Sequence, residues 1–559
     1  MTSQAPFLCL PREMRDAIYE AYLLLDDGYV FDFECNKLRT SSGQPIDLSL
    51  MYTCRLVAAE MAGLPLRTNT VTFRTVYSDT MRTSLGRFEF LLQFLREQNQ
   101  ELITCTADYL NPEMRDRICQ DYPDVYPFFD ANWMREAEMG EHSRKIASDE
   151  QCLLPGAKDP GRFDNPEFPL LWIFDAYSQQ ASSAHSDSES AVRLVELQAS
   201  PWTIWSEDEL DKLIRSFTMP KPYDLLKIEF ATHMEGQFYK VWWDTWGARA
   251  KARASAAAVA IRFLQSYPRA RNDLRRIVVD EDHEASAFPE CHAKGLIPFC
   301  RENQHLRVER RVSLWNSAFH RHYADDGWSA VHWFTTTPRN TLGDYPGLDA
   351  NAVSENIAVW LEEASVLCEA GMPRDVFTLI LDGRPAPAQA TRIFQEVVQR
   401  DAAWQLAAEA RFLGENLNTG DRCRIWLDIF RADGWDPTEH VWMRKEFPRL
   451  LADLGNNVPS SHGVRFRANF DVGQPWTAWE VAQIIAANEE PELTVEKWGM
   501  KWYDGRVQEM YETEPPLPPF PELERQQLRE VPDDVRKLLD EMRKEEALRF
   551  YLRRDLEND

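Results

Sequence analysis

The sequence lacks the motifs that mark several common enzyme classes. It contains no GxxxxGK[ST] phosphate loop, no GxGxxG turn after a strand-like run and no GxSxG nucleophile elbow. Those motifs provide backbone amides for phosphate groups or an exposed serine for acyl transfer. Their absence favours a non-enzymatic protein, so we predict no catalytic residue and no cofactor.

Positive charge and long apolar runs are also scarce. Lys and Arg number 63 against 90 Asp and Glu, which gives a formal net charge of -27. This excess repels phosphate backbones and anionic lipids, so we expect no nucleic-acid partner and no membrane partner. No apolar run reaches about 18 residues, and the N-terminal one ends at Pro11, too short for a signal peptide. We expect a soluble intracellular protein, with the cytoplasm as the default compartment and the nucleus as the alternative.

The ten cysteines form no CxxC pair and no regular spacing, which indicates reduced thiols rather than a disulfide framework. Two groups have residue types that suit a metal ion, but neither has zinc-finger or HExxH spacing. We therefore assign no metal ligand and keep a metal-dependent enzyme as the weakest functional alternative. The groups are His283, Cys291, His292, Cys300 and His305, and then His320, His322, Asp325, Asp326 and His332.

Hydrophobic residues make up 44% of the chain and aromatic residues 12%, enough to fill sizeable cores. Short apolar runs predict strands, and apolar residues at helical spacing predict helices between them. This alternation predicts a helix-rich, mixed α+β fold. The predicted strands are 71–73, 225–230, 274–279, 306–314 and 377–381, and the predicted helices include 85–97, 249–265, 353–369 and 387–412.

Composition divides the chain into a helical N-terminal module, a helix-strand body and a charged tail. The Ser-rich stretch 177–191 lacks apolar periodicity, which predicts a flexible loop before the body. In the tail, the proline run 515–521 is a stiff linker or an SH3 or WW ligand, and a helix is predicted over 533–556. The predicted boundaries are 1–80 for the module, 81–176 for a mixed segment, 177–191 for the loop, 192–486 for the body and 487–559 for the tail.

The N-terminal module begins with an amphipathic helix. Met14, Ile18 and Tyr22 follow Pro11 at helical spacing, and proline suits a first helical turn. The pattern then predicts a strand or hairpin within 26–46 and a second helix near 48–61.

Residues 6 to 75 resemble the F-box, and more closely the F-box-like domain of uncharacterised fungal proteins. The motifs occur in the order of that family: LPxEMR from Leu10, then CR at Cys54-Arg55, LPL from Leu64 and NTVTF from Asn69. Residues 263–314 resemble the same fungal proteins. The sequence departs from the F-box pattern in the insertion 26–46 and at Arg15, where an apolar contact is usual.

The resemblance implies a module that binds a Skp1-like adaptor and links a body, which holds a second and unknown protein, to a ubiquitin ligase. Three functions stay open: this F-box-type substrate receptor, a structural scaffold without a ubiquitin link, and the metal-dependent enzyme. In the scaffold alternative the module is a packed N-terminal cap. The protein-interaction residues implied by the resemblance are Leu8, Leu10, Pro11, Glu13, Ile18, Cys54 and Arg55.

Overall fold

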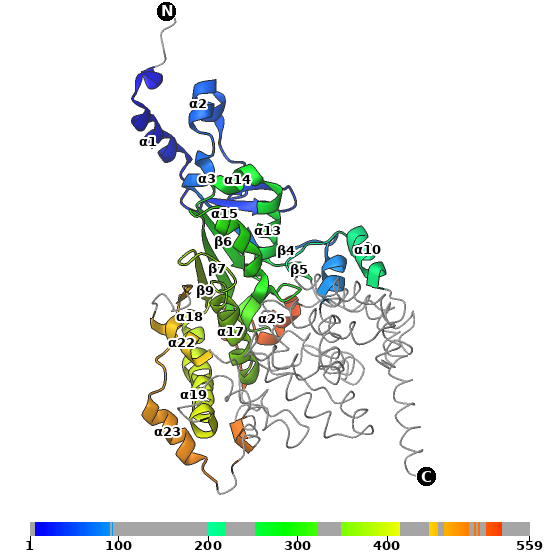
Figure 1. The fold of residues 1–559 in the computed structure, drawn as a ribbon, viewed down its shortest axis with the longest axis vertical. Helices are drawn as coiled ribbons and strands as arrows, with labels where there is room; N and C mark the ends of the chain where they lie inside the picture. Colours follow the sequence, from blue (N-terminus) through cyan, green and yellow to red (C-terminus); the bar gives the residue numbers. More distant parts are fainter. Residues whose placement is uncertain are drawn as a thin grey trace, which may run out of the picture.

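The computed structural model describes residues 6–89, 92, 200–217, 252–320, 348–413, 447–456, 463–490 and 510–527, together with 493, 497, 498, 501 and 502. The predicted strand 225–230, loop 177–191 and tail helix 533–556 lie outside these residues, as does most of the segment 81–176. Figure 1 shows a central sheet with helices beside it. No helix in the described ranges combines the length and the apolar character that crossing a lipid bilayer requires.

The central sheet has seven strands in the order β10-β9-β7-β6-β3-β1-β2. From β3 onward the sheet grows in one direction, because β6, β7, β9 and β10 each lie beside the sheet strand that precedes them along the chain. The hairpin β1–β2 is antiparallel, and all other neighbouring strands are parallel. The strands are β1 (Tyr29–Asp32), β2 (Lys37–Thr40), β3 (Thr70–Arg74), β6 (Arg276–Glu281), β7 (Arg307–Ser313), β9 (Phe377–Asp382) and β10 (Arg465–Ala468).

One face of the sheet is buried under helices. On β7, Val308, Arg310 and Val312 are buried and alternate with more exposed residues. Helix α13 (Ala256–Ser266) contacts β3 and β6, and α22 (Phe447–Asn456) contacts β10. Right-handed crossovers place all connecting helices on one side when a parallel sheet grows in one direction. The prediction of a helix-rich, mixed α+β fold is confirmed.

Most predicted elements that fall in the described ranges are present, but the helix predicted near 48–61 is instead a 3-10 turn (Ser49–Tyr52) followed by the short helix α2 (Arg55–Glu60). The predicted strands 71–73, 274–279, 306–314 and 377–381 are β3, β6, β7 and β9. The predicted helix 353–369 is α17 (Ala350–Ser365), and 387–412 contains α18 (Pro387–Ile393) and α19 (Gln399–Ala408). The predicted helix 249–265 begins later, at α13, because Ser255 caps it by accepting a hydrogen bond from the Ala258 amide at 3.0 Å.

The insertion 26–46 is the predicted hairpin, and it belongs to the sheet of the body. Its strands β1 and β2 form one edge of that sheet, next to β3. Phe31 packs against Phe73 of β3 and Phe263 of α13, with ring centroids 5.7 and 5.1 Å away. The segment 1–80 therefore supplies three strands of the body as well as the N-terminal helices.

The proline run packs against the body. Leu517 and Phe520 are buried, and the Phe520 ring stacks on His320 with centroids 5.8 Å apart. The Gln389 side chain of α18 donates to the Glu512 carbonyl at 2.7 Å. These contacts favour the linker interpretation over the ligand interpretation, because an SH3 or WW ligand needs an accessible polyproline face.

Candidate protein-interaction surface

Helices α1 (Arg12–Leu23) and α2 (Arg55–Glu60) project from the β1–β2 end of the sheet, beyond α3 (Leu64–Thr68) (Figure 1). With the turns beside them they form the N-terminal helical module, residues 6–25 and 48–68. This module has a core of its own, separate from the main core. The core consists of Tyr19, Leu23, Val57 and Met61, all at most 3% exposed.

A polar network ties α1 to α2. The Glu60 carboxylate accepts hydrogen bonds from Arg15 Nε at 3.0 Å and from the Tyr19 hydroxyl at 2.7 Å. Arg15 also donates to the Leu10 carbonyl at 2.5 Å. The hydrogen bond from Arg15 is the main reason why the pKa of Glu60 falls from 4.5 to about 2. Arg15, which departs from the F-box pattern, therefore faces inward and holds the two helices together.

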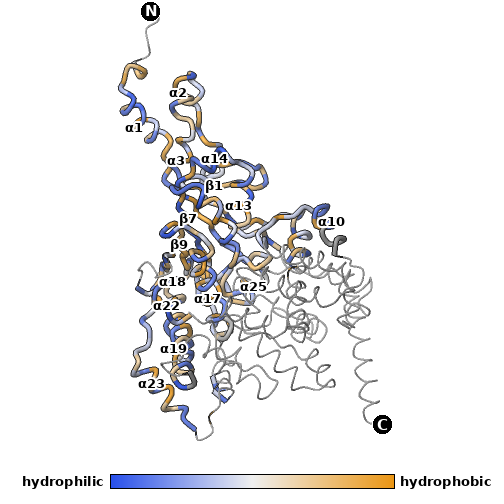
Figure 2. Tube along the Cα trace, viewed as in Figure 1, coloured by the Kyte–Doolittle hydropathy of each residue, from blue (hydrophilic) through white to orange (hydrophobic). Residues whose placement is uncertain are grey.

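A neighbouring face of α1 presents apolar side chains to solvent. Met14 is 53% exposed, Ile18 40% and Tyr22 39%, and their spacing of four residues aligns them on one helix face. Elsewhere in the module, Tyr52 is 83% exposed and Leu56 of α2 is 49% exposed. Figure 2 shows hydrophobic residues interspersed with hydrophilic ones along this projecting part. We call Met14, Ile18 and Tyr22 the apolar stripe; exposed apolar groups aligned in this way are typical of interaction sites.

The residues implied by the F-box resemblance all lie in the N-terminal helical module, and Ile18 belongs to the stripe. Leu8 and Leu10 are half-buried under the start of α1, and Leu8 packs on the module core. The other five are exposed, at the first turns of α1 and α2 or within α1: Pro11, Glu13, Ile18, Cys54 and Arg55. None of the seven is buried against the body.

Sequence reasoning missed two members of the stripe as site residues, Met14 and Tyr22. The signal for both was present, because they share the spacing of Ile18. That spacing identifies a helix face without telling which face is buried. The buried face is one residue further on, at Tyr19 and Leu23.

The residues considered as metal ligands have other partners. Buried His292 shares a hydrogen bond with the Ser255 hydroxyl at 2.7 Å and donates to the Ala287 carbonyl at 2.6 Å. Burial lowers its pKa to about 3. His320 donates to a backbone carbonyl, and the rest of its group, at 322–332, lies outside the described residues. Within the described ranges no three His, Cys, Asp or Glu side chains are placed to hold a metal ion.

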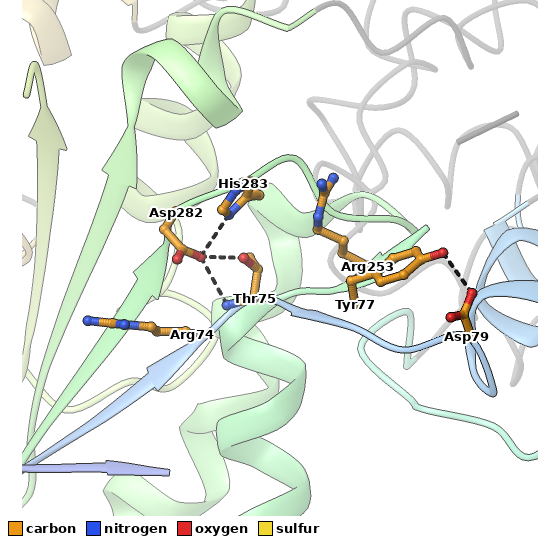
Figure 3. A pocket seen from close by; sticks show the side chains of 7 residues that line it. All are labelled: Arg74, Thr75, Tyr77, Asp79, Arg253, Asp282 and His283. Atoms are coloured by element: carbon orange, nitrogen blue, oxygen red, sulfur yellow. Dashed lines mark hydrogen bonds and ion pairs between the residues drawn. The ribbon is translucent and has the colours of Figure 1, made fainter. Parts of the chain in front are cut away.

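A pocket of about 530 Å³ opens where β3 and β6 end (Figure 3). The Thr75 hydroxyl donates to the Asp282 carboxylate, and His283 Nδ1 lies 3.5 Å from the same oxygen. Burial raises the pKa of Asp282, but the hydrogen bonds from His283 and Thr75 outweigh it and leave the pKa below its ordinary value.

Nucleophilic catalysis of the triad type would need a hydroxyl or thiol bonded to the imidazole. The Thr75 hydroxyl instead bonds to the carboxylate and not to the imidazole of His283. The lining residues therefore contain an acid-imidazole pair without a nucleophile directed at it. The rest of the lining is Arg74, Tyr77, Asp79 and Arg253.

Comparison with known proteins leaves the family open. No family model, no curated protein and no solved structure matches this chain.

Proposed function

We propose that the chain is a non-enzymatic interaction protein whose apolar stripe binds a second protein. The first candidate for that protein is a Skp1-like adaptor, which would make the chain an F-box-type substrate receptor of a cytoplasmic ubiquitin ligase. The observation that carries the proposal is the exposure of Met14, Ile18 and Tyr22 on a helix held by its own small core. A packed cap would instead direct these side chains at the body.

Covering the stripe would contribute favourable free energy to binding. Full burial of a large apolar side chain stabilises by about 1.5–3 kcal/mol, so covering the half-exposed Met14, Ile18 and Tyr22 yields roughly 1 kcal/mol each. The Arg15–Glu60 network reduces the conformational cost, since the two helices are already held in place before binding.

A structural scaffold without a ubiquitin link is the second candidate. It would use the same stripe for another protein. Whether a Skp1-like adaptor binds separates the two candidates.

The test is co-purification of the Skp1-like adaptor with the tagged full-length chain. We expect Ile18→Asp to abolish retention, because a carboxylate at the centre of the stripe would be buried without a partner. Trp479→Asp is the matched control, since Trp479 is 70% exposed on α23 (Ala478–Ala487) of the body. Both variants should keep the melting temperature of the wild type.

Each outcome decides between the candidates. Retention by wild type and by Trp479→Asp, with loss in folded Ile18→Asp, supports the adaptor proposal. Retention by Ile18→Asp would show that the stripe is not the binding surface. If the wild type retains no adaptor, the F-box-type proposal fails and the scaffold replaces it.

A further inference from the structure

The face of the sheet opposite the helices carries charged side chains. On β7, Arg307, Glu309 and Arg311 alternate with the buried residues that face the helices. The register with β7 directs Arg276, Val278 and Asp280 of β6 to this face, where Val278 is buried and Arg276 is exposed. On β10, Arg465 and Arg467 flank the buried Phe466. We call this surface, formed by the outward residues of β3, β6, β7, β9 and β10, the open face.

Arginine outnumbers acidic residues on the open face, although the chain as a whole has a net charge of -27. Several of these arginines have carboxylate partners: Arg74 lies 3.8 Å from Asp280, Arg311 2.5 Å from Glu309, and Arg465 3.2 Å from Asp375. Among the described residues, Arg276, Arg307 and Arg467 are exposed and have no carboxylate partner.

Arg276 and Arg307 also lie side by side. They are register partners on the parallel strands β6 and β7, whose backbones are about 4.8 Å apart. Arg276 donates one hydrogen bond to the Thr68 carbonyl, and Arg307 donates from a single nitrogen to the Gln304 and Leu306 carbonyls. Two like charges so close together repel each other, and a bound anion would relieve that repulsion.

We propose that the open face binds an acidic segment of a partner protein. Guanidinium groups recognise carboxylates through paired hydrogen bonds, so Arg276 and Arg307 form the main anchor. Arg467 forms a second anchor two strands and about four residues further along, roughly 16 Å away by standard strand spacings. An extended segment of about five residues spans that distance.

The chemistry of the face favours a polypeptide over a nucleic acid. Asp280 and Glu309 lie among the arginines and would repel a continuous phosphate backbone, whereas the amides of a peptide can donate to them. The residues between the arginines, such as Thr72, Thr378 and Ile380, also provide no aromatic ring on which a base could stack.

This inference goes beyond the proposed function and does not depend on it, since the open face and the apolar stripe belong to different parts of the chain. The test measures anisotropy of a fluorescein-labelled 12-residue oligoglutamate titrated with the full-length chain at low ionic strength. We expect the double variant Arg276→Ala/Arg307→Ala to bind about tenfold or more weakly, since two charge-assisted contacts are lost. Binding should also weaken as salt is added.

The matched control is Arg269→Ala/Arg301→Ala. These two arginines are exposed on α14 (Pro268–Asp273) and α15 (Ile297–Glu302), so the control removes the same charge elsewhere. Near-wild-type binding by this control and by Ile18→Asp supports the proposal. Equal weakening in both double variants would reduce the effect to net charge and overturn it.

Two further results would overturn the proposal. One is the absence of oligoglutamate binding to the wild type at up to about 1 mM, the weak end of specific affinities. The other is tighter binding of a 12-residue oligothymidylate through the same arginines, which would indicate a nucleic-acid surface. Melting curves of each variant establish that the fold is retained.

Discussion

Replacing Glu281 by Gln should destabilise the body strongly, because Glu281 is the partner of a buried arginine. The two side chains, Glu281 and Arg310, are 1% and 2% exposed, and they lie 2.8 Å apart. The Glu281 carboxylate also accepts from the amides of Ala256 and Ala257 at the start of α13, at 2.8 and 3.3 Å. It thus balances the buried charge and satisfies the first turn of the helix.

The expected loss of unfolding free energy follows from the two features that glutamine lacks, the negative charge and the second acceptor oxygen. Oε1 accepts from Arg310 and from the Ala257 amide, so a glutamine carbonyl there keeps both contacts but brings no negative charge, and its NH₂ group then faces the Ala256 amide, which is a donor. Breaking a buried ion pair by removing one partner costs about 3–5 kcal/mol, since the remaining charge stays buried. Arg310 retains its contact with the Trp360 ring, 4.6 Å from the centroid, which only partly offsets the loss.

The assay is urea unfolding of the full-length chain, followed by tryptophan fluorescence. Glu309→Gln is the matched control, because it makes the same chemical change on β7 at a side chain that is 32% exposed. Exposed pairs contribute about 0–1 kcal/mol, so the control should shift the midpoint little. Equal shifts for the two variants would refute the reasoning. A large shift for Glu281→Gln alone would show that the buried pair holds β6 and β7, the strands that carry Arg276 and Arg307.

Three further predictions follow from the contacts. The folded-state pKa of Glu60 lies below its usual value, so its stabilising effect is full above about pH 4.5 and is lost as the pH falls towards 2. Hydrogen exchange of the α1 amides should therefore quicken at low pH in the wild type, and Glu60→Gln should remove this acid sensitivity. Phe520→Ala should release the proline run to proteolysis at a cost of about 3–5 kcal/mol of docking energy, whereas cleavage unchanged from wild type would contradict the packing. Gly28 and Gly43 both have positive φ, +64° and +77°, but only at Gly28 would a Cβ collide with a backbone carbonyl, that of Thr70. Gly28→Ala should therefore lower the melting temperature more than Gly43→Ala, as thermal melting would show.

The N-terminal helix illustrates how far sequence reasoning reached. The spacing of Met14, Ile18 and Tyr22 predicts a helix, and α1 is present. It did not reveal that this face is exposed, because α1 carries apolar residues on two faces. Which face of α1 is buried depends on Glu60 and Val57, which lie about 40 residues later in the chain and pack on the Tyr19 side.

Arg15 and the insertion 26–46 were both departures from the F-box pattern, and tertiary structure gives each a role. Arg15 pairs with Glu60, and the insertion forms the edge hairpin of the body sheet. Neither pairing could be read from local sequence, since a surface arginine and an inward one differ only in what lies opposite.

The sequence by itself determined the local elements and the fold class. Alternation on β7 and periodicity on α17 depend on neighbours within a few residues, so these patterns are visible in one segment at a time. Only tertiary structure decided the surfaces. The open face brings together Arg276, Arg307 and Arg467 from strands far apart in the chain. The apolar stripe is exposed because the module core buries the Tyr19 and Leu23 face of α1 instead. Which residues share a surface depends on strand order and on long-range packing, and neither leaves a local signal in the sequence.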